Sequence, residues 1–154
     1  MLKKSKKTKG AKTSGRYVIV ASKYNGRYVN SMLKAVRAEL KTAGAEEVRV
    51  VRVPGAYEIP VVAGALARQA PRWDAIICLG VILRGATTHA QHIGDAVSLA
   101  LAEIQVREGV PVIHEVLLFE NVEQAKVRCL DKGFNRGNEA AQTALEMARV
   151  MRSL

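Results

Sequence analysis

The chain has 154 residues, 49% of them hydrophobic and 25% charged, which is typical of one soluble globular domain. No run of about 18 apolar residues occurs, and this excludes a membrane-spanning helix of ordinary length. The formal net charge is +10, but much of it comes from the lysine-rich segment 1–13, which has no acidic residue. We therefore predict a basic, disordered tail over 1–13 and a single domain over 14–154.

The tail has two possible roles. Its lysines could bind nucleic acid or another acidic surface through release of counterions. A solubilising role is favoured, because the tail has no interleaved aromatic residue and the rest of the chain has no zinc-finger or RNP-type motif. The tail also lacks the apolar stretch and cleavage site of a secretory signal, which favours a cytoplasmic protein.

The first half of the domain alternates strand and helix patterns. Residues 16–22, "RYVIVAS", predict a strand, and a helix that stops near Gly44 follows the loop "KYNG". The apolar residues of this helix recur three and four positions apart: Met32, Leu33, Val36 and Leu40. Residues 48–53 predict a second strand, ended by "PG". Residues 58–70 predict a helix with Pro60 in its first turn.

The second half continues the alternation. Residues 75–83, "AIICLGVIL", form a continuous apolar run, which is typical of a parallel strand covered on both faces. Residues 89–107 predict a helix, and 110–118 predict a fourth strand. One stripe of the helix is apolar: Ile93, Val97, Leu101 and Ile104. Two further helices are predicted over 121–130 and 137–151.

Strands that alternate with helices predict a parallel sheet with right-handed crossovers. The expected architecture is an α/β three-layer α/β/α sandwich with a four-stranded parallel sheet. In such folds the ligand site lies at the carboxyl ends of the strands. The loops after Ser22, Val53, Leu83 and Leu118 are therefore the candidate site.

Two cysteines lie in these elements. Cys78 falls in an apolar strand and Cys129 in a helical pattern, without metal-ligand spacing between them. We expect two buried free thiols in a reducing cytoplasm rather than a disulfide.

The loop "RGATTH" connects the third strand to its helix. Gly85 permits a tight turn, and free amide groups at a helix start can bind an anion. The alternative is simple helix capping by Thr87 or Thr88. His89, in the first helical turn, could transfer protons near neutral pH, although a lone histidine is more often structural or merely exposed.

The other loops also leave alternatives open. Glu58 could accept hydrogen bonds from substrate hydroxyls, or could act only as a favourable charge at a helix start. Tyr24 could stack on a heteroaromatic ring or belong to the core, and Asn25 could bond to ring edges or cap a helix. Arg128 is suited to bidentate phosphate binding, although a lone arginine on a helix is usually solvated.

Taken together, the loops resemble those of one enzyme family. The motifs "KYN", "VPGAYEIP", "LGVILRGATTH", "ENVEQAKVR", "NRGNEAA" and "ALEMA" occur in the order and at the spacings of the 6,7-dimethyl-8-ribityllumazine synthases. The likeness runs from about Arg16 to Leu154, and "PGAYEIP" with "RGATTH" at this separation is a specific combination. It implies a flavodoxin-like fold that assembles as a homo-pentamer, in some members as twelve pentamers in an icosahedral shell, with active sites between subunits.

The resemblance also implies the reaction. The family condenses 5-amino-6-(D-ribitylamino)uracil with 3,4-dihydroxy-2-butanone 4-phosphate and releases phosphate, without a metal or an organic cofactor. The steps are imine formation, loss of phosphate, tautomerisation and ring closure. Riboflavin synthase is a further partner that the resemblance suggests.

Roles in binding the pyrimidine are implied residue by residue. Tyr24, where the family usually has phenylalanine, would stack on the uracil ring, with Asn25 beside it. Ala56, Tyr57 and Glu58 would hold the ribityl chain. Three strand residues would line the pyrimidine pocket: Val81, Ile82 and Leu83.

The phosphate side is implied in the same way. Gly85, Ala86 and Thr87 would cradle the phosphate, and Arg128 of the adjacent subunit would complete that site. His89 matches the family's proton-transfer residue. Arg136 and Glu139 match a basic–acidic pair near the ring, where the family more often has lysine; by spacing alone they would be a modest surface ion pair.

The chain departs from the family pattern at two places. Ala90 and Gln91 stand where members often have an aromatic residue and an acid. "IHEVLLF" stands where many have phenylalanine and glycine before "VLTT", so His114 replaces an aromatic residue that comes from the neighbouring subunit, and Leu118 and Phe119 replace two threonines. The alternative function is therefore a weakly catalytic shell or scaffold protein of the same fold, whose basic tail binds an anionic partner.

Overall fold

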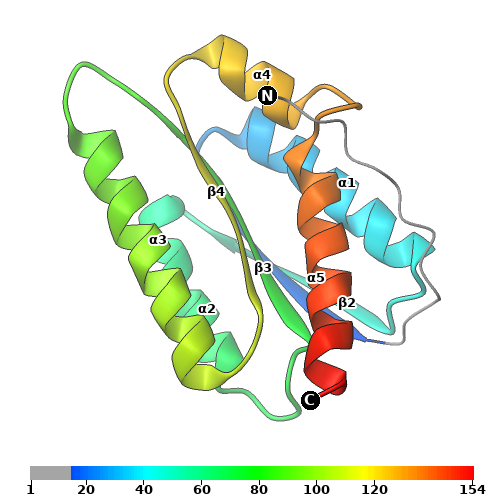
Figure 1. Ribbon diagram of the computed structural model, residues 1–154. Coiled ribbons are helices and arrows are strands. Elements are labelled where there is room, and N and C mark those ends of the chain that lie inside the picture. Colours follow the sequence, from blue (N-terminus) through cyan, green and yellow to red (C-terminus); the bar gives the residue numbers. More distant parts are fainter. Residues whose placement is uncertain (1–14) are drawn as a thin grey trace.

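The computed structural model of the chain describes residues 15–154. The basic tail expected over 1–13 lies outside these residues. The described chain folds into a single four-stranded sheet with helices on both faces (Figure 1). The elements follow one another in this order: β1 (Arg16–Ser22), α1 (Gly26–Thr42), β2 (Glu47–Val53), η1 (Ala56–Glu58), α2 (Ile59–Ala67), β3 (Ala75–Leu83), α3 (His89–Glu108), β4 (Val112–Phe119), α4 (Val122–Cys129) and α5 (Arg136–Arg152).

The sheet has the strand order β2-β1-β3-β4, and all its neighbouring strands are parallel. β3 is the most deeply buried strand, as its continuous apolar run predicts, because it lies between β1 and β4 and is covered on both faces. The predicted three-layer α/β/α, flavodoxin-like architecture is confirmed. In the described residues, no helix is both long and apolar enough to cross a membrane.

Each face of the sheet has its own hydrophobic core. Alternate residues of β1 point to opposite faces: Tyr17 and Ile19 join the core beneath α1, α4 and α5, whereas Val18 and Val20 join the core beneath α2 and α3. In Figure 1 the two groups of helices lie on opposite sides of the sheet. The molecule is therefore held together by two cores that meet only through the strands.

Most element boundaries lie within about one residue of the sequence expectation, and two differ by more. The helix expected over 58–70 is preceded by the short 3-10 turn η1 and ends at Ala67, while Pro60 does lie in the first turn of α2. The last strand begins at Val112 rather than at 110, because Pro111 has no N–H to donate and contributes only its carbonyl, which accepts from the Ile76 amide.

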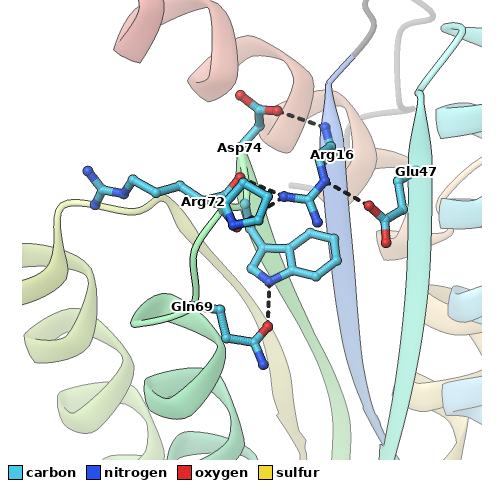
Figure 2. Close-up of polar contacts among 7 residues, drawn as sticks. Arg16, Glu47, Gln69, Arg72 and Asp74 are labelled. Atoms are coloured by element: carbon cyan, nitrogen blue, oxygen red, sulfur yellow. Dashed lines mark hydrogen bonds and ion pairs between the residues drawn. The ribbon is translucent and has the colours of Figure 1, made fainter.

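The amino ends of the strands are tied together by Arg16 (Figure 2). Its backbone N–H donates to Asp74 at 2.7 Å, its Nε donates to Glu47 at 2.7 Å, and its Nη1 donates to the carbonyl of Pro71 at 3.0 Å. The guanidinium also lies over the Trp73 ring, 4.4 Å from the ring centroid. These contacts join β1 to β2 and to the start of β3 at the edge of the sheet opposite the candidate site.

Helices α1 and α5 approach each other closely at Gly137. A Cβ added to Gly137 would lie 2.9 Å from the Met32 Cα and closer still to the Met32 carbonyl oxygen. Because these are backbone atoms, they cannot turn aside as a side chain could. Glycine at this position therefore sets the separation of the two helices.

Candidate active site

A cavity of about 650 Å³ opens on the site loops. It lies at the carboxyl ends of β1, β2 and β3, where parallel α/β folds bind their ligands. It brings together nine residues that the sequence predicts for the site: Tyr24, Asn25, Ala56, Tyr57, Glu58, Val81, Ile82, Leu83 and His89. These nine residues therefore form one connected surface within a single chain.

Tyr24 provides the flat wall of the cavity. Its side chain is 67% exposed, so the alternative in which it belongs to the core is wrong. The ring lies over Gly55, since a Cβ there would come within 2.7 Å of the ring. Gly55 is thus needed for the ring to reach its place, and the exposed ring face is available for stacking.

Asn25 ties the first site loop to β3. Its backbone is left-handed, with φ of 54°, and its Nδ2 donates to the Val81 carbonyl at 2.7 Å. It occupies the N-cap position of α1, but its side chain makes no capping hydrogen bond. The amide therefore fixes the width of the cavity between the β1–α1 loop and β3.

The Asn25→Ala variant is expected to lose about 2 kcal/mol of unfolding free energy, because it loses a hydrogen bond and places alanine in the left-handed region. Asn25→Gly should lose about half as much, because glycine adopts that backbone without strain. Denaturant unfolding measures both, with the exposed Asn30→Ala as control. Equal stability of the wild type and the Asn25→Gly variant would contradict a role for the bond to Val81.

Glu58 has the role at a helix start that its sequence left open. Its Oε2 accepts from the Gly55 N–H at 3.0 Å, which satisfies a free backbone donor at the start of η1. This bond orients the carboxylate on the cavity wall. Because Oε1 is not used by the capping bond, the same group can accept a hydrogen bond from a ligand hydroxyl.

The loop from β3 to α3 contains the predicted phosphate cradle. Gly85, Ala86 and Thr87 are exposed and lie along the chain between the cavity residues Leu83 and His89. Helix capping by Thr88 is not observed, since this N-cap side chain makes no capping hydrogen bond. A Cβ at Gly85 would meet nothing within 4 Å.

The turn that Gly85 is expected to permit does not require glycine in this structure. Its φ is not in the left-handed region, and the space beside it is open. Thr87 makes only one weak local bond, in which its Oγ1 accepts from the His89 amide at 3.3 Å. The loop thus leaves room for an anion to approach the backbone at the start of α3.

Three further residues of α3 line the cavity: His92, whose contribution the sequence leaves open, and Ile93 and Ala96, which the sequence did not assign to the site. They follow His89 by three, four and seven positions, which is the spacing of one helix face. That periodicity, counted from His89, was the signal that could have found them. His92 Nε2 lies 3.3 Å from the Thr88 hydroxyl, so this second histidine is bonded to the same loop.

The residues after His89, where the chain departs from the family pattern, have structural roles. Ala90 is buried in the core beneath α2 and α3. The Gln91 side chain accepts from Arg84 at 2.9 Å and donates to Asp95 at 2.8 Å. Arg84 also pairs with Glu120 at 2.7 Å, so it fastens the ends of β3 and β4 to α3.

A second cavity, of about 300 Å³, lies beyond the carboxyl end of β4. It is lined by Leu117, Leu118, Phe119, Gln124, Arg128 and Arg136. Arg128 and Arg136 thus share a cavity, but not the one that contains His89. Leu118 and Phe119 give this cavity an apolar wall in place of the hydroxyls of two threonines.

The pair of Arg136 and Glu139 is part of a larger network. Arg136 pairs with Glu139 through Nη1 and with Glu115 through Nε and Nη2, at 3.1 and 3.2 Å. The pair with Glu139 that the spacing predicts is therefore present between two half-exposed side chains, and Arg136 also reaches the buried Glu115. Nothing in the sequence analysis selected Glu115, since an acid in an apolar strand has no motif of its own.

His114 lies outside both cavities in the single chain. Its Nδ1 accepts from the Val116 amide at 3.1 Å, so the proton is on Nε2, which lies 2.8 Å from the Ser98 hydroxyl. Burial lowers the pKa of His114, which favours this neutral form. A neutral imidazole that donates to Ser98 cannot activate that hydroxyl, so the pair is no nucleophilic dyad.

The two cysteines are buried free thiols, as predicted. Burial raises the pKa of Cys78 and of Cys129 to about 12, so both remain protonated at neutral pH.

A cavity at the carboxyl edge of a parallel sheet, with a ring platform, an oriented carboxylate and histidines on one helix face, is the arrangement of an α/β enzyme. Comparison with known proteins agrees with this class. The family model for 6,7-dimethyl-8-ribityllumazine synthase matches residues 14–152. The chain therefore belongs to the 6,7-dimethyl-8-ribityllumazine synthase family, which are transferases of riboflavin biosynthesis.

Individual relatives are similar over nearly their whole length. The 6,7-dimethyl-8-ribityllumazine synthase of Xanthomonas campestris pv. campestris (strain B100) is 40% identical over 144 residues, which cover 92% of this chain and 93% of the relative. The enzyme of the same name from Xanthomonas euvesicatoria pv. vesicatoria (strain 85-10) is 39% identical over the same shares. The family match over residues 14–152 includes every element that carries the two cavities.

Proposed function

We propose that this protein condenses 5-amino-6-(D-ribitylamino)uracil with 3,4-dihydroxy-2-butanone 4-phosphate in the cavity of about 650 Å³. The observation that carries the proposal is that Tyr24, Glu58 and His89, which follow three different strands, line this one cavity. They supply the ring platform, the hydroxyl acceptor and the proton-transfer group that the reaction requires. Family membership supports the same activity.

Each group has a defined task. The Tyr24 ring stacks on the uracil, while the Glu58 carboxylate accepts hydrogen bonds from the ribityl hydroxyls. The backbone of 85–87 and Arg128 bind the phosphate. The amine of the uracil adds to the ketone and water leaves, which gives the imine. Phosphate then departs, and tautomerisation and ring closure with loss of a second water follow.

The protein needs little further apparatus for these steps. Holding two substrates side by side removes much of the entropic barrier. Positive charge at Arg128 and the helix start stabilises the leaving phosphate. His89 moves protons between nitrogen, carbon and oxygen as the steps proceed.

We further propose that the complete site forms between two copies of the chain. The two halves of the expected site lie in separate cavities of one chain, so a neighbour's Arg128 cavity would have to face the His89 cavity. Exposed apolar side chains on α2 and α3 support contact with another copy: Val61, Leu99 and Val106. A homo-pentamer or a shell of twelve pentamers would provide this contact, and light scattering separates the two.

The proposed cellular location is the cytoplasm. Two buried free thiols suit a reducing cytoplasm. Riboflavin synthase, which would consume the lumazine, is the proposed partner.

The proposal is tested by assaying the full-length protein with both substrates and following the absorbance of the lumazine. We expect the protein to catalyse lumazine formation, and we expect deletion of residues 1–12 to leave the rate unchanged. Absence of product at high protein concentration would reject the proposal and favour the scaffold alternative. In that case, the scaffold alternative would be supported if deletion of residues 1–12 abolished anion binding.

A further inference from the structure

Glu115 is the only charged residue that is buried among residues 15–154. It lies on β4, is 5% exposed and points toward the layer of α4 and α5. Burying an ionised carboxylate is costly unless it is paired and hydrogen-bonded. The role of Glu115 therefore depends on the group that pairs with it.

The partner of Glu115 is Arg136, which lines the second cavity. Arg136 Nε lies 3.1 Å from Oε2 of Glu115, and Nη2 lies 3.2 Å from Oε1, so the two groups form a bidentate pair. Glu139 holds Nη1 of the same guanidinium. A guanidinium has five N–H groups, and those not used in these contacts can donate to a ligand.

The charges around Glu115 nearly cancel. Arg136 and Glu139 face it from α5, and Arg128 and the Cys129 thiol face it from α4. With Glu115 ionised, two arginines are matched by two carboxylates. With Glu115 protonated, the cavity gains an uncompensated positive charge, which strengthens its attraction for a doubly charged anion.

We propose that Glu115 is a positioning residue of the two-arginine cavity: its carboxylate fixes Arg136 in place, and its proton uptake sets how strongly Arg128 and Arg136 together bind an anion. This inference deepens the proposed function, on which it rests, because the anion there is the phosphate of the butanone substrate. The anion binds more tightly when Glu115 is protonated and more weakly when it is ionised.

The Glu115 carboxyl gains and loses its proton near neutral pH. Burial raises the pKa of Glu115 to about 7, against the opposing effect of Arg136 and with a smaller rise from the negative Glu139. Cys129 remains protonated in this range, because burial raises its pKa to about 12. His114 immediately precedes Glu115 in β4 and points to the opposite face of the sheet.

The test uses sulfate and the full-length assembled protein. Sulfate keeps its double charge throughout the neutral range, so a change in its affinity with pH reports the protein and not the ligand. Calorimetric titration at constant ionic strength should show the dissociation constant rising up to about tenfold from pH 6 to pH 8, if only the protonated form binds. A flat profile in the wild type overturns the proposal without any variant.

Variants then assign the effect. Glu115→Gln keeps the shape of the side chain without its charge, so sulfate affinity at pH 8 should equal that of the wild type at pH 6, with a flat profile. Glu115→Asp should restore a pH dependence. Glu123→Gln on α4 is the control, because Glu123 is exposed and pairs only with Lys126, and its profile should match that of the wild type.

The outcomes separate this inference from the proposed function. Lumazine formation with a wild-type pH profile in Glu115→Gln would overturn the role of Glu115 and leave the enzyme assignment intact. If Glu115→Gln does not fold, the wild-type and Glu115→Asp profiles decide. The same variants should alter the KM for the phosphorylated substrate more than kcat, whereas a purely structural role would change the melting temperature alone.

Discussion

The His89→Ala variant is expected to lower kcat roughly 100-fold, the lower end of what a positioned proton-transfer group contributes. The melting temperature should stay unchanged, because His89 is exposed in the first turn of α3 and its ring has no part in either core. Steady-state assays with both substrates and thermal unfolding measure the two effects. Imidazole in the buffer should restore part of the lost rate, since the space of the ring is left open.

His92→Ala is the matched comparison for this prediction. His92 lies one turn further along the same helix face and lines the same cavity. It is bonded to Thr88, so we expect it to act through the loop and to cost less than tenfold in kcat. A larger loss in His92→Ala than in His89→Ala would move the proton-transfer role to His92.

The Gly137→Ala variant is expected to lose about 2–3 kcal/mol of unfolding free energy. The added Cβ would meet the backbone of Met32, so α1 and α5 would have to separate along their contact. For a domain of this size, the melting temperature should fall by roughly 4–12 °C.

Gly94→Ala in α3 is the control for this substitution. A Cβ at Gly94 would lie 3.9 Å from Leu118, which is an ordinary contact. The gain in helix propensity should then leave the protein equally stable or more stable by up to about 1 kcal/mol. A Gly137→Ala variant as stable as Gly94→Ala would show that the helices can adjust.

The alternation of apolar patterns was enough to predict the fold. β1 and β3 have the predicted bounds, because each is a short apolar run between turn residues. The end of α2 was missed, since "RQA" continues a helical pattern and only tertiary context stops the helix at Ala67. The start of β4 was missed by two residues for a local reason, the absent N–H of Pro111.

The site was predicted in part. Loop position alone grouped Tyr24, Glu58 and His89, because parallel strands present their carboxyl ends on one edge of the sheet. Contacts between residues far apart in the chain could not be predicted from the sequence. The contact of Glu115 with Arg136, for example, joins a strand to a helix 21 residues later. The bond of Asn25 to Val81 spans 56 residues, and no spacing rule connects them.

The two separate cores have a consequence for inheritance. Each cavity takes part of its wall from a different core: Ala56 and Ile82 of the His89 cavity belong to the core beneath α2 and α3, and Leu117 and Phe119 of the Arg128 cavity pack in the core beneath α1, α4 and α5. If neighbouring copies join these cavities as proposed, every working site takes its halves from different chains. Two alleles damaged on opposite faces of the sheet could then complement each other in one cell, because some boundaries would unite two undamaged halves.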